Sequence, residues 1–245
     1  GATRLLTFIV GADKTYEATI LLGVATDSDD ADGTETARAD AAAVAAVTDG
    51  SIADGVAALT GEIDQVPSRV SAIKVQGRRA YDLVRAGEDV ELKARRVTVS
   101  RFDVVAQRRG AGTIELDVVV DCTSGTYIRA LARDLGERLG VGGHLTALRR
   151  TRVGGFDVAG AASVDAIAED SLMDAAEAAA EVVGALPVTA EDARDLRHGK
   201  RIDGGARLTG ALAAAIDPDG RLVGIVERRG AQMKSVMNMP EEAAP

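Results

Sequence analysis

The clearest alternation of hydrophobic and polar positions in the chain lies in residues 113–122, TIELDVVVDC. Every second residue from Ile114 onward is apolar, and the residues between them are mostly acidic. A period of two is typical of a β-strand with one buried face. Residues 16–22 repeat the alternation and predict a second strand. Residues 95–109 predict a third, which should form a hairpin with 113–122 across Gly110–Gly112.

The period changes after residue 125, because the apolar side chains then recur at helical spacing, at Ile128, Leu131, Leu135 and Leu139. We therefore predict a helix over 127–139. Arg129 falls in its first turn, where the helix macrodipole disfavours a cation. We therefore expect a carboxylate to offset the unfavourable position of the Arg129 charge. It could come from the same helix, as Asp134 or Glu137, or from another part of the chain.

The remaining pattern predicts an α+β fold with a mixed, mostly antiparallel sheet, because no regular strand–helix–strand alternation appears. A small β-rich domain should follow at residues 185–240, with a disordered tail at 241–245. The other expected elements are one or two helices in 37–60 broken at Asp49–Gly50, a short helix over 79–86, a loop at 140–156 leading to a short helix or strand, a helical connector over 163–183, a helix over 190–197, and strands near 211–217 and 221–227.

Composition narrows the class of protein. With 245 residues, 46% of them hydrophobic and 27% charged, the chain resembles an ordinary soluble globular protein. No apolar run is long enough to span a membrane and no signal peptide opens the chain, so we expect a cytoplasmic protein. The single cysteine excludes an internal disulfide, and with only two histidines a His/Cys metal site is implausible. Neither an NTP-binding nor a dinucleotide-binding glycine motif is present.

Charge gives a mixed indication about nucleic acid. The net charge of −9 argues against a generally basic surface. Arginine nevertheless far outnumbers lysine and clusters locally, at Arg78–Arg79, Arg95–Arg96, Arg108–Arg109 and Arg149–Arg150–Arg152. Each cluster is either a solvated face or part of a phosphate-binding groove. The acidic turn (residues 26–33, TDSDDADG) loosely resembles a calcium loop but lacks its terminal glutamate, which disfavours calcium binding.

Four stretches together match a known family. They are DKTYEATILLGVATDSDDADG, GEIDQVPSRVSAIKVQGRRAYDLVRAG, DCTSGTYIRALARDLGERLGVGGHLTALRRTRVG and, more weakly, the C-terminal segment. In combination they resemble the bacterial tRNA pseudouridine synthase B (TruB) family, of the actinobacterial type. The resemblance implies a catalytic domain over residues 1–184 and a PUA-like RNA-binding domain over 185–240.

The resemblance also implies an activity. Family members convert uridine 55 in the TΨC loop of tRNA to pseudouridine, without cofactor or metal, and we expect the T-arm of tRNA as partner and a monomeric protein. An aspartate attacks a flipped-out uridine, and the arginine of the YIR motif, here Arg129, pairs with that aspartate. The pairing would compensate the position of Arg129 at a helix N-terminus and keep the aspartate ionised.

Further site residues follow from the same resemblance. Tyr16 is expected to stack on the uracil and to help move its proton, and Tyr127 and Leu148 to line the same pocket. Without the resemblance, Tyr16 would be an ordinary core or edge residue of its strand. The expected RNA contacts are Lys74, Arg78, Arg79, Arg149 and Arg150, with Tyr81 in the same stretch.

The chain departs from the family in one respect. The GxLDPxATG motif that carries the nucleophilic aspartate is absent, as is the DKPxG strand before it. The sequence therefore predicts a family member lacking its N-terminal segment and unable to turn over as written. The alternative function is a tRNA-binding or RNA-chaperone module without catalysis. The acidic turn is not a substitute for the missing motif, because it matches a different stretch of the family.

Overall fold

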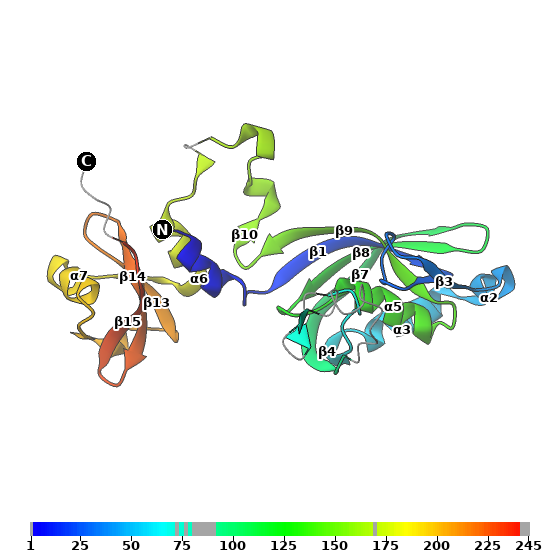
Figure 1. Ribbon diagram of the computed structural model, residues 1–245, viewed down its shortest axis with the longest axis horizontal. Coiled ribbons are helices and arrows are strands. Elements are labelled where there is room, and N and C mark those ends of the chain that lie inside the picture. The colour runs from blue at the N-terminus through cyan, green and yellow to red at the C-terminus, as the bar shows by residue number, and fades with distance from the viewer. Residues whose placement is uncertain (1, 72–73, 76–77, 80–91, 169–170, 241–245) are drawn as a thin grey trace. The chain divides into compact units, whose positions relative to one another are not determined.

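The computed structural model describes residues 2–71, 74–75, 78–79, 92–168 and 171–240 (Figure 1). The chain forms two compact units. We call Asp13–Val153 the central unit, and Gly1–Ala12 together with Gly154–Pro245 the terminal unit. No helix in the described ranges combines the length and apolar character needed to cross a membrane. The predicted domain boundary between residues 184 and 185 stays a prediction.

The central unit combines strands with three helices among its described residues. Its elements are β1 (Lys14–Leu22), β2 (Val24–Thr26), β3 (Glu35–Arg38), α2 (Ala41–Ala46), α3 (Asp49–Ala58), β4 (Gly61–Gln65), β5 (Lys74–Val75), β6 (Arg78–Arg79), β7 (Arg95–Arg109), β8 (Ile114–Cys122), α5 (Ile128–Arg138) and β9 (Gly143–Val153).

Five of these strands form an antiparallel sheet in the order β9-β1-β8-β7-β4. The predicted hairpin of β7 and β8 is confirmed. Along β8, buried residues alternate with half-buried ones, as its pattern predicted. Tyr16 on β1 lies opposite Val120 of β8 and Arg150 of β9. This register determines which of the candidate site residues share a face of the sheet.

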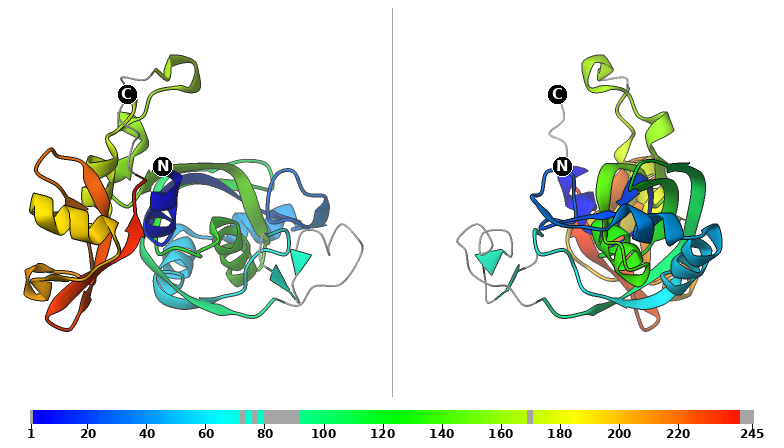
Figure 2. Two further views of the ribbon diagram at one scale, coloured as in Figure 1. Left: turned by 60° about the vertical axis from the view of Figure 1, so that its left-hand side comes forward. Right: turned by 90° about the vertical axis from the view of Figure 1, so that its right-hand side faces the viewer.

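One face of this sheet carries the core of the central unit. Buried side chains of β1 and β8, such as Ile20 and Leu116, pack against Ile52 of α3 and Leu131 and Leu135 of α5. Figure 2 shows both helices on the same side of the sheet. Burying each such side chain contributes about 1.5–3 kcal/mol. The core therefore fixes α5, and with it the YIR segment, against the sheet.

Helix α5 is held closely at both ends. At its N-cap, the Gln65 side chain accepts a hydrogen bond from the Tyr127 N–H (2.8 Å) and donates one to the Tyr127 carbonyl (3.1 Å). Toward the other end, a Cβ on Gly136 would lie 2.2 Å from the carbonyl carbon of Gly142. A residue larger than glycine cannot fit there without moving the backbone, which explains a glycine inside a helix.

Three details of the predicted central unit are wrong. The Ala-rich segment breaks at residues 47–48 rather than Asp49–Gly50, because Thr48 and Ser51 form a capping box that starts α3. Residues 143–153 form one long strand, β9, because pairing with β1 along its length overrides a glycine-rich, irregular pattern. Arg79 lies in strand β6 rather than at a helix start, and residues 80–86 lie outside the described residues.

The terminal unit contains a second sheet. Its elements are a 3₁₀ turn (Ala2–Leu5), α1 (Leu6–Ile9), β10 (Phe156–Asp157), 3₁₀ turns at Val158–Gly160 and Val164–Ala166, α6 (Ala175–Val183), β11 (Ala185–Pro187), α7 (Ala190–Arg197), β12 (Ile202–Asp203), a 3₁₀ turn (Gly205–Arg207), β13 (Leu212–Ile216), β14 (Leu222–Arg229) and β15 (Gln232–Asn238).

This sheet has the strand order β11-β13-β14-β15-β12. The predicted helix over 190–197 and the two predicted strands are confirmed as α7, β13 and β14. The predicted connector over 163–183 is α-helical only from Ala175 onward among its described residues, after a 3₁₀ turn at Val164–Ala166. Leu5 packs with Ala179 of α6 and Ile225 of β14, so both chain ends share one core. The predicted tail at 241–245 lies outside the described residues.

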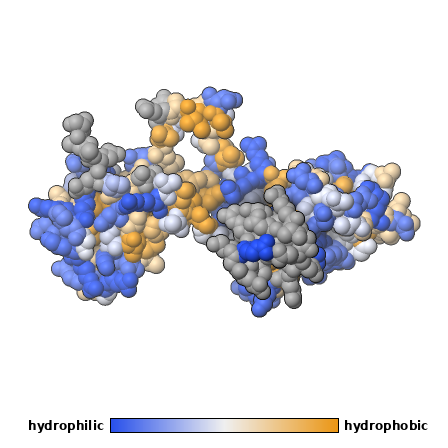
Figure 3. All heavy atoms as spheres, viewed as in Figure 1, coloured by the Kyte–Doolittle hydropathy of each residue, from blue (hydrophilic) through white to orange (hydrophobic). Residues whose placement is uncertain are grey.

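Large apolar side chains are exposed on the segment between β10 and α6. Val164, Leu172 and Met173 have exposed fractions of 87%, 70% and 58%. In Figure 3 part of this segment, near the top of the view, is coloured orange.

Candidate functional site

Arg129, in the first turn of α5, contacts two loops of the central unit. Its guanidinium donates to the carbonyl oxygens of Ser28 (3.4 Å) and Val70 (2.8 Å). Its Nε lies 3.8 Å from Oδ2 of Asp30. Arg129 thus pairs with a carboxylate from another part of the chain rather than with Asp134 or Glu137 of its own helix. A guanidinium has five N–H donors, so donors remain for a further carboxylate.

Asp30 is a site residue that sequence reasoning missed. It belongs to the acidic turn, whose carboxylates the sequence does not distinguish from one another. Its backbone exchanges hydrogen bonds with the Thr26 hydroxyl, and it forms an isolated bridge with Leu145 of β9. A turn closed in this way presents one particular carboxylate to Arg129. Only the fold could indicate which one.

A second arginine, Arg133, lies one helical turn further along α5. It donates to Oδ2 of Asp29 (3.2 Å), to Oδ1 of Asp134 (2.7 Å) and to the carbonyl of Val66 (2.7 Å). Burial raises the pKa of the Asp134 carboxyl, and the Arg133 guanidinium opposes that rise. The same-helix ion pair expected as an alternative for Arg129 is therefore made by Arg133.

Tyr16 is half-buried on the face of the sheet that α5 covers, and packs against the core cluster that includes Ile128. Partial burial raises the pKa of its hydroxyl, and a hydrogen bond with Arg150 works in the opposite direction. The hydroxyl is therefore protonated at neutral pH and can act as a proton donor. Tyr16 and Arg129 lie on the same side of the sheet.

Arg149 and Arg150, which the sequence analysis grouped together, lie on opposite faces of strand β9. Partners directly opposite each other in an antiparallel pair share a face of the sheet. Arg150 is opposite Tyr16, whereas Arg149 is opposite Glu17 on the other face. Leu148 is opposite Ala18, shares the face of Tyr16, and has an exposed fraction of 47%. By this register Tyr16, Leu148 and Arg150 lie on one face of the sheet, and Arg149 lies on the other.

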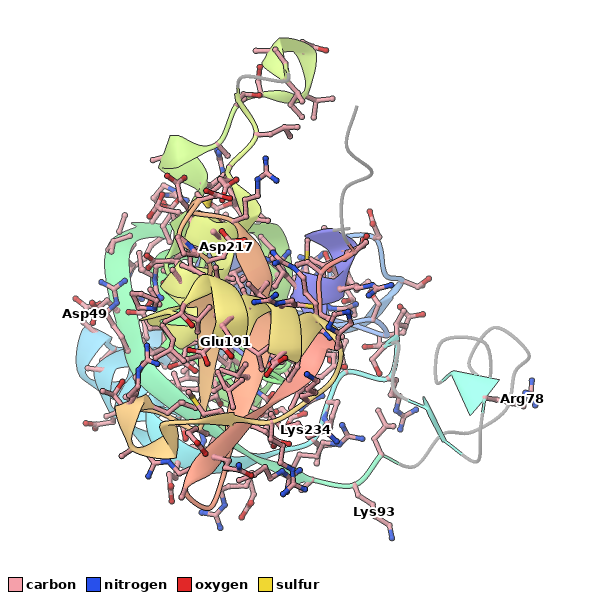
Figure 4. All side chains as sticks on the ribbon, turned by 90° about the vertical axis from the view of Figure 1, so that its left-hand side faces the viewer. Asp49, Arg78, Lys93, Glu191, Asp217 and Lys234 are labelled. Atoms are coloured by element: carbon pink, nitrogen blue, oxygen red, sulfur yellow. The ribbon has the colours of Figure 1, made fainter. Side chains whose placement is uncertain are left out.

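The other predicted residues are placed less fully. Tyr127 is the N-cap of α5, two residues before Arg129, with its backbone held by Gln65. Lys74 and Arg79 pair across the two-stranded β5–β6 hairpin. Arg78 on that hairpin is exposed, and its side chain points outward in Figure 4. Tyr81 lies outside the described residues.

The candidate site consists of oxygen acceptors, guanidinium groups and aromatic rings. No group of three or more His, Cys, Asp or Glu side chains that could hold a metal ion occurs in the part of the chain that the structure describes. Its described groups include the Arg129 guanidinium beside the Asp30 carboxylate and the phenol of Tyr16, which is hydrogen-bonded to Arg150.

Three family models match the chain in succession. The N-terminal domain of the TruB family pseudouridylate synthases matches residues 1–128. The tRNA pseudouridylate synthase B C-terminal domain matches residues 129–190, and the C-terminal model of tRNA pseudouridine synthase II matches residues 184–240. The chain belongs to the TruB family of pseudouridylate synthases. The resemblance expected from the four sequence stretches is confirmed.

Individual relatives agree with this assignment. The chain is 54% identical over 244 residues to tRNA pseudouridine synthase B of Leifsonia xyli subsp. xyli, covering 98% of this chain and 81% of that protein. It is 50% identical over 246 residues to tRNA pseudouridine synthase B of Arthrobacter sp. (strain FB24), covering 96% of this chain and 79% of that protein.

Among solved structures, a Cbf5–Nop10–Gar1 complex matches with a TM-score of 0.64 and 21% identity, over 98% of this chain and 69% of that chain. An H/ACA RNP bound to a substrate RNA containing 2'-deoxyuridine matches with a TM-score of 0.62 and 19% identity, over 99% of this chain and 69% of that chain. Similarity at this level of identity concerns the fold. The predicted α+β fold with a β-rich C-terminal domain is confirmed.

Proposed function

We propose that the protein isomerises uridine 55 in the TΨC loop of tRNA to pseudouridine. In this reaction the bond from ribose to N1 of uracil is broken, the base is rejoined through C5, the C5 proton is released, and N1 takes up a proton. The relatives named tRNA pseudouridine synthase B support tRNA as the substrate. The choice of uridine 55 rests on the resemblance of the YIR and acidic-turn segments to the family.

The observation that carries the proposal is the environment of Arg129. Its guanidinium is fixed by two carbonyl oxygens and lies 3.8 Å from Asp30, with donors left over. We assign it to bind and keep ionised the attacking aspartate, since an adjacent cation lowers a carboxylate pKa. We assign Tyr16, Leu148 and Arg150 to the surface that receives the flipped uracil, with Tyr127 at its edge.

The attacking aspartate is not assigned to a residue of this chain. No GxLDPxATG motif occurs between Gly1 and Pro245. We propose that residues 1–245 by themselves bind a T-arm stem-loop without turning it over. A protein that carries this motif together with residues 1–245, called the gene-encoded protein below, should be active.

Tritium release tests both statements, because tritium placed at C5 of uridine leaves when pseudouridine forms. We expect release from tRNA with the gene-encoded protein and only background release with residues 1–245. Arg129→Ala in the gene-encoded protein should abolish most of the activity. Arg38→Ala is the matched control, because Arg38 forms an exposed ion pair with Glu35 on β3.

Other results would contradict the proposal. Release by residues 1–245 well above background would assign the attack to a carboxylate of this chain, with Asp30, which lies 3.8 Å from Arg129, the first candidate. Tight tRNA binding by the gene-encoded protein, without any release, would favour the alternative of a tRNA-binding or RNA-chaperone module.

A further inference from the structure

Arg129 and Arg133 contact the same two loops from one face of α5. Residues four apart on a helix are neighbours on its surface. Arg129 bonds the carbonyl of Ser28 in the acidic turn and that of Val70. Arg133 bonds the Asp29 carboxylate in the acidic turn and the carbonyl of Val66. Each arginine thus joins the acidic turn to the loop at residues 66–71.

The pair of Arg133 and Asp29 is not an ordinary surface ion pair. The exposed fractions of the two side chains are 21% and 11%, so water and salt screen their attraction weakly. Arg133 also holds Asp134, so one cation compensates two carboxylates that are largely withdrawn from water. Removing a partner from a buried ion pair leaves an uncompensated charge and is strongly unfavourable.

Asp29 also has an unusual backbone. Its φ of 58° makes it the one residue other than glycine with a positive φ among the described residues. Side chains disfavour this left-handed region, and residues held there persist only where their surroundings fix them. Here the Asp29 carbonyl accepts from the Leu145 N–H (3.1 Å), and its carboxylate accepts from Arg133. Arg133 is thus the side chain that anchors the strained residue.

The strained residue directly precedes Asp30 and directly follows Ser28, the two acidic-turn residues that contact Arg129. If Asp29 relaxed to an ordinary conformation, the direction of the chain would change at both neighbours. The Asp30 carboxylate and the Ser28 carbonyl would then leave the Arg129 guanidinium. The orientation of Arg129 thus depends on a residue that it does not contact.

We propose that Arg133 and Asp29 are positioning residues of the candidate site: their ion pair locks the acidic turn in its left-handed conformation and thereby orients Arg129. The proposal rests on the proposed function for its effect on turnover, but not for its effect on the acidic turn. Neither residue contacts the substrate. Their removal should lower the rate of the chemical step and leave tRNA binding nearly unchanged.

The experiment compares Arg133→Gln, Asp29→Asn and the double variant in the gene-encoded protein, with Arg38→Gln as the matched control. We expect each single variant to lower kcat for pseudouridine formation about tenfold or more, with KM for a T-arm stem-loop within about twofold of the parent. The double variant should be no worse than the more impaired single variant, because both substitutions break the same ion pair. Arg38→Gln should match the parent.

A second measurement does not depend on activity. Hydrogen–deuterium exchange at residues 26–34 should become at least about tenfold faster in Arg133→Gln and Asp29→Asn, and stay unchanged in Arg38→Gln. Unchanged exchange in the acidic turn overturns the proposal. So does a normal kcat in variants that remain folded at the assay temperature, since only stability would then depend on the pair. Multiplicative losses in the double variant also overturn it.

The two proposals fail in different ways. If the parent protein forms no pseudouridine in tRNA, the proposed function fails, and the exchange data alone decide whether the pair locks the turn. If the parent is active and the variants are too, the function stands and the positioning role is overturned.

Discussion

At the scale of single residues, the environment of Arg129 explains its position. A cation in the first helical turn costs about 0.3–1 kcal/mol. Two carbonyl oxygens and the Asp30 carboxylate more than offset that cost, since a hydrogen bond to a charged group contributes about 1.5–3 kcal/mol. The sequence identified Arg129 as a residue that needs a partner. It could not identify Asp30, because the contact joins residues far apart in the chain.

Tyr16 allows a test that separates stacking from proton transfer. Tyr16→Phe keeps the ring, and stacking on a base contributes about 1–3 kcal/mol, so substrate binding should be normal. Burial raises the pKa of the Tyr16 hydroxyl, so the parent protein carries a phenolic proton that the Tyr16→Phe variant lacks. Single-turnover rates in the gene-encoded protein should therefore fall by about 10²-fold or more. Tyr16→Leu should lose both binding and turnover.

Thermal melting of both variants is the control for this test. If Tyr16 is only a structural residue of its strand, Tyr16→Phe should have almost no effect on turnover or stability. Tyr16→Leu should then lower the melting temperature without a selective loss of turnover. Parent-like turnover in Tyr16→Phe would remove the hydroxyl from the chemistry.

At the scale of helices and strands, local periodicity predicted β8, α5 and α7, because each buries one face against a single core. It failed for β9, whose pattern follows from pairing with β1 and contains two register shifts. Those shifts determine which of Arg149 and Arg150 shares the face of Tyr16. The sequence grouped Arg149 with Arg150 as expected RNA contacts, and the register of β9 places the two residues on opposite faces of the sheet.

Helix α5 offers a test of how the site is supported. Gly136→Ala should destabilise the protein by about 1–3 kcal/mol, the usual range for overpacking, because the new methyl would meet the backbone of Gly142 and Gly143. Gly50→Ala is the matched control in α3: the nearest atom to its new methyl is 3.8 Å away. That change should be neutral or stabilise by up to about 1 kcal/mol.

Urea denaturation of both variants gives the free energies of unfolding. A stable Gly136→Ala variant would mean that α5 can shift away from residues 142–143. In that case Arg129 and Arg133, which α5 carries, should show changed activity even though the fold is retained.

At the scale of the whole molecule, the net charge of −9 coexists with a substrate that is a polyanion. Many of the arginine side chains already form ion pairs with carboxylates of the same chain. On β7, Arg96 pairs with Asp64, Arg101 with Asp121, and Arg108 with Glu115 and Asp117. These clusters behave as the solvated faces that the sequence left open. The arginines of β9 are therefore better candidates for phosphate contact than those of β7.

The salt dependence of tRNA binding should distinguish the two arginines of β9. Arg150 shares a face with Tyr16, and Arg149 lies opposite Glu17 on the other face. Neutralising one phosphate contact flattens the slope of log K against log salt by about 0.7–0.9. We expect that change for Arg150→Gln and none for Arg149→Gln, measured with tRNA over a series of salt concentrations. Equal flattening by both would mean that RNA contacts both faces of the sheet, and no change in either would mean that both side chains are only solvated.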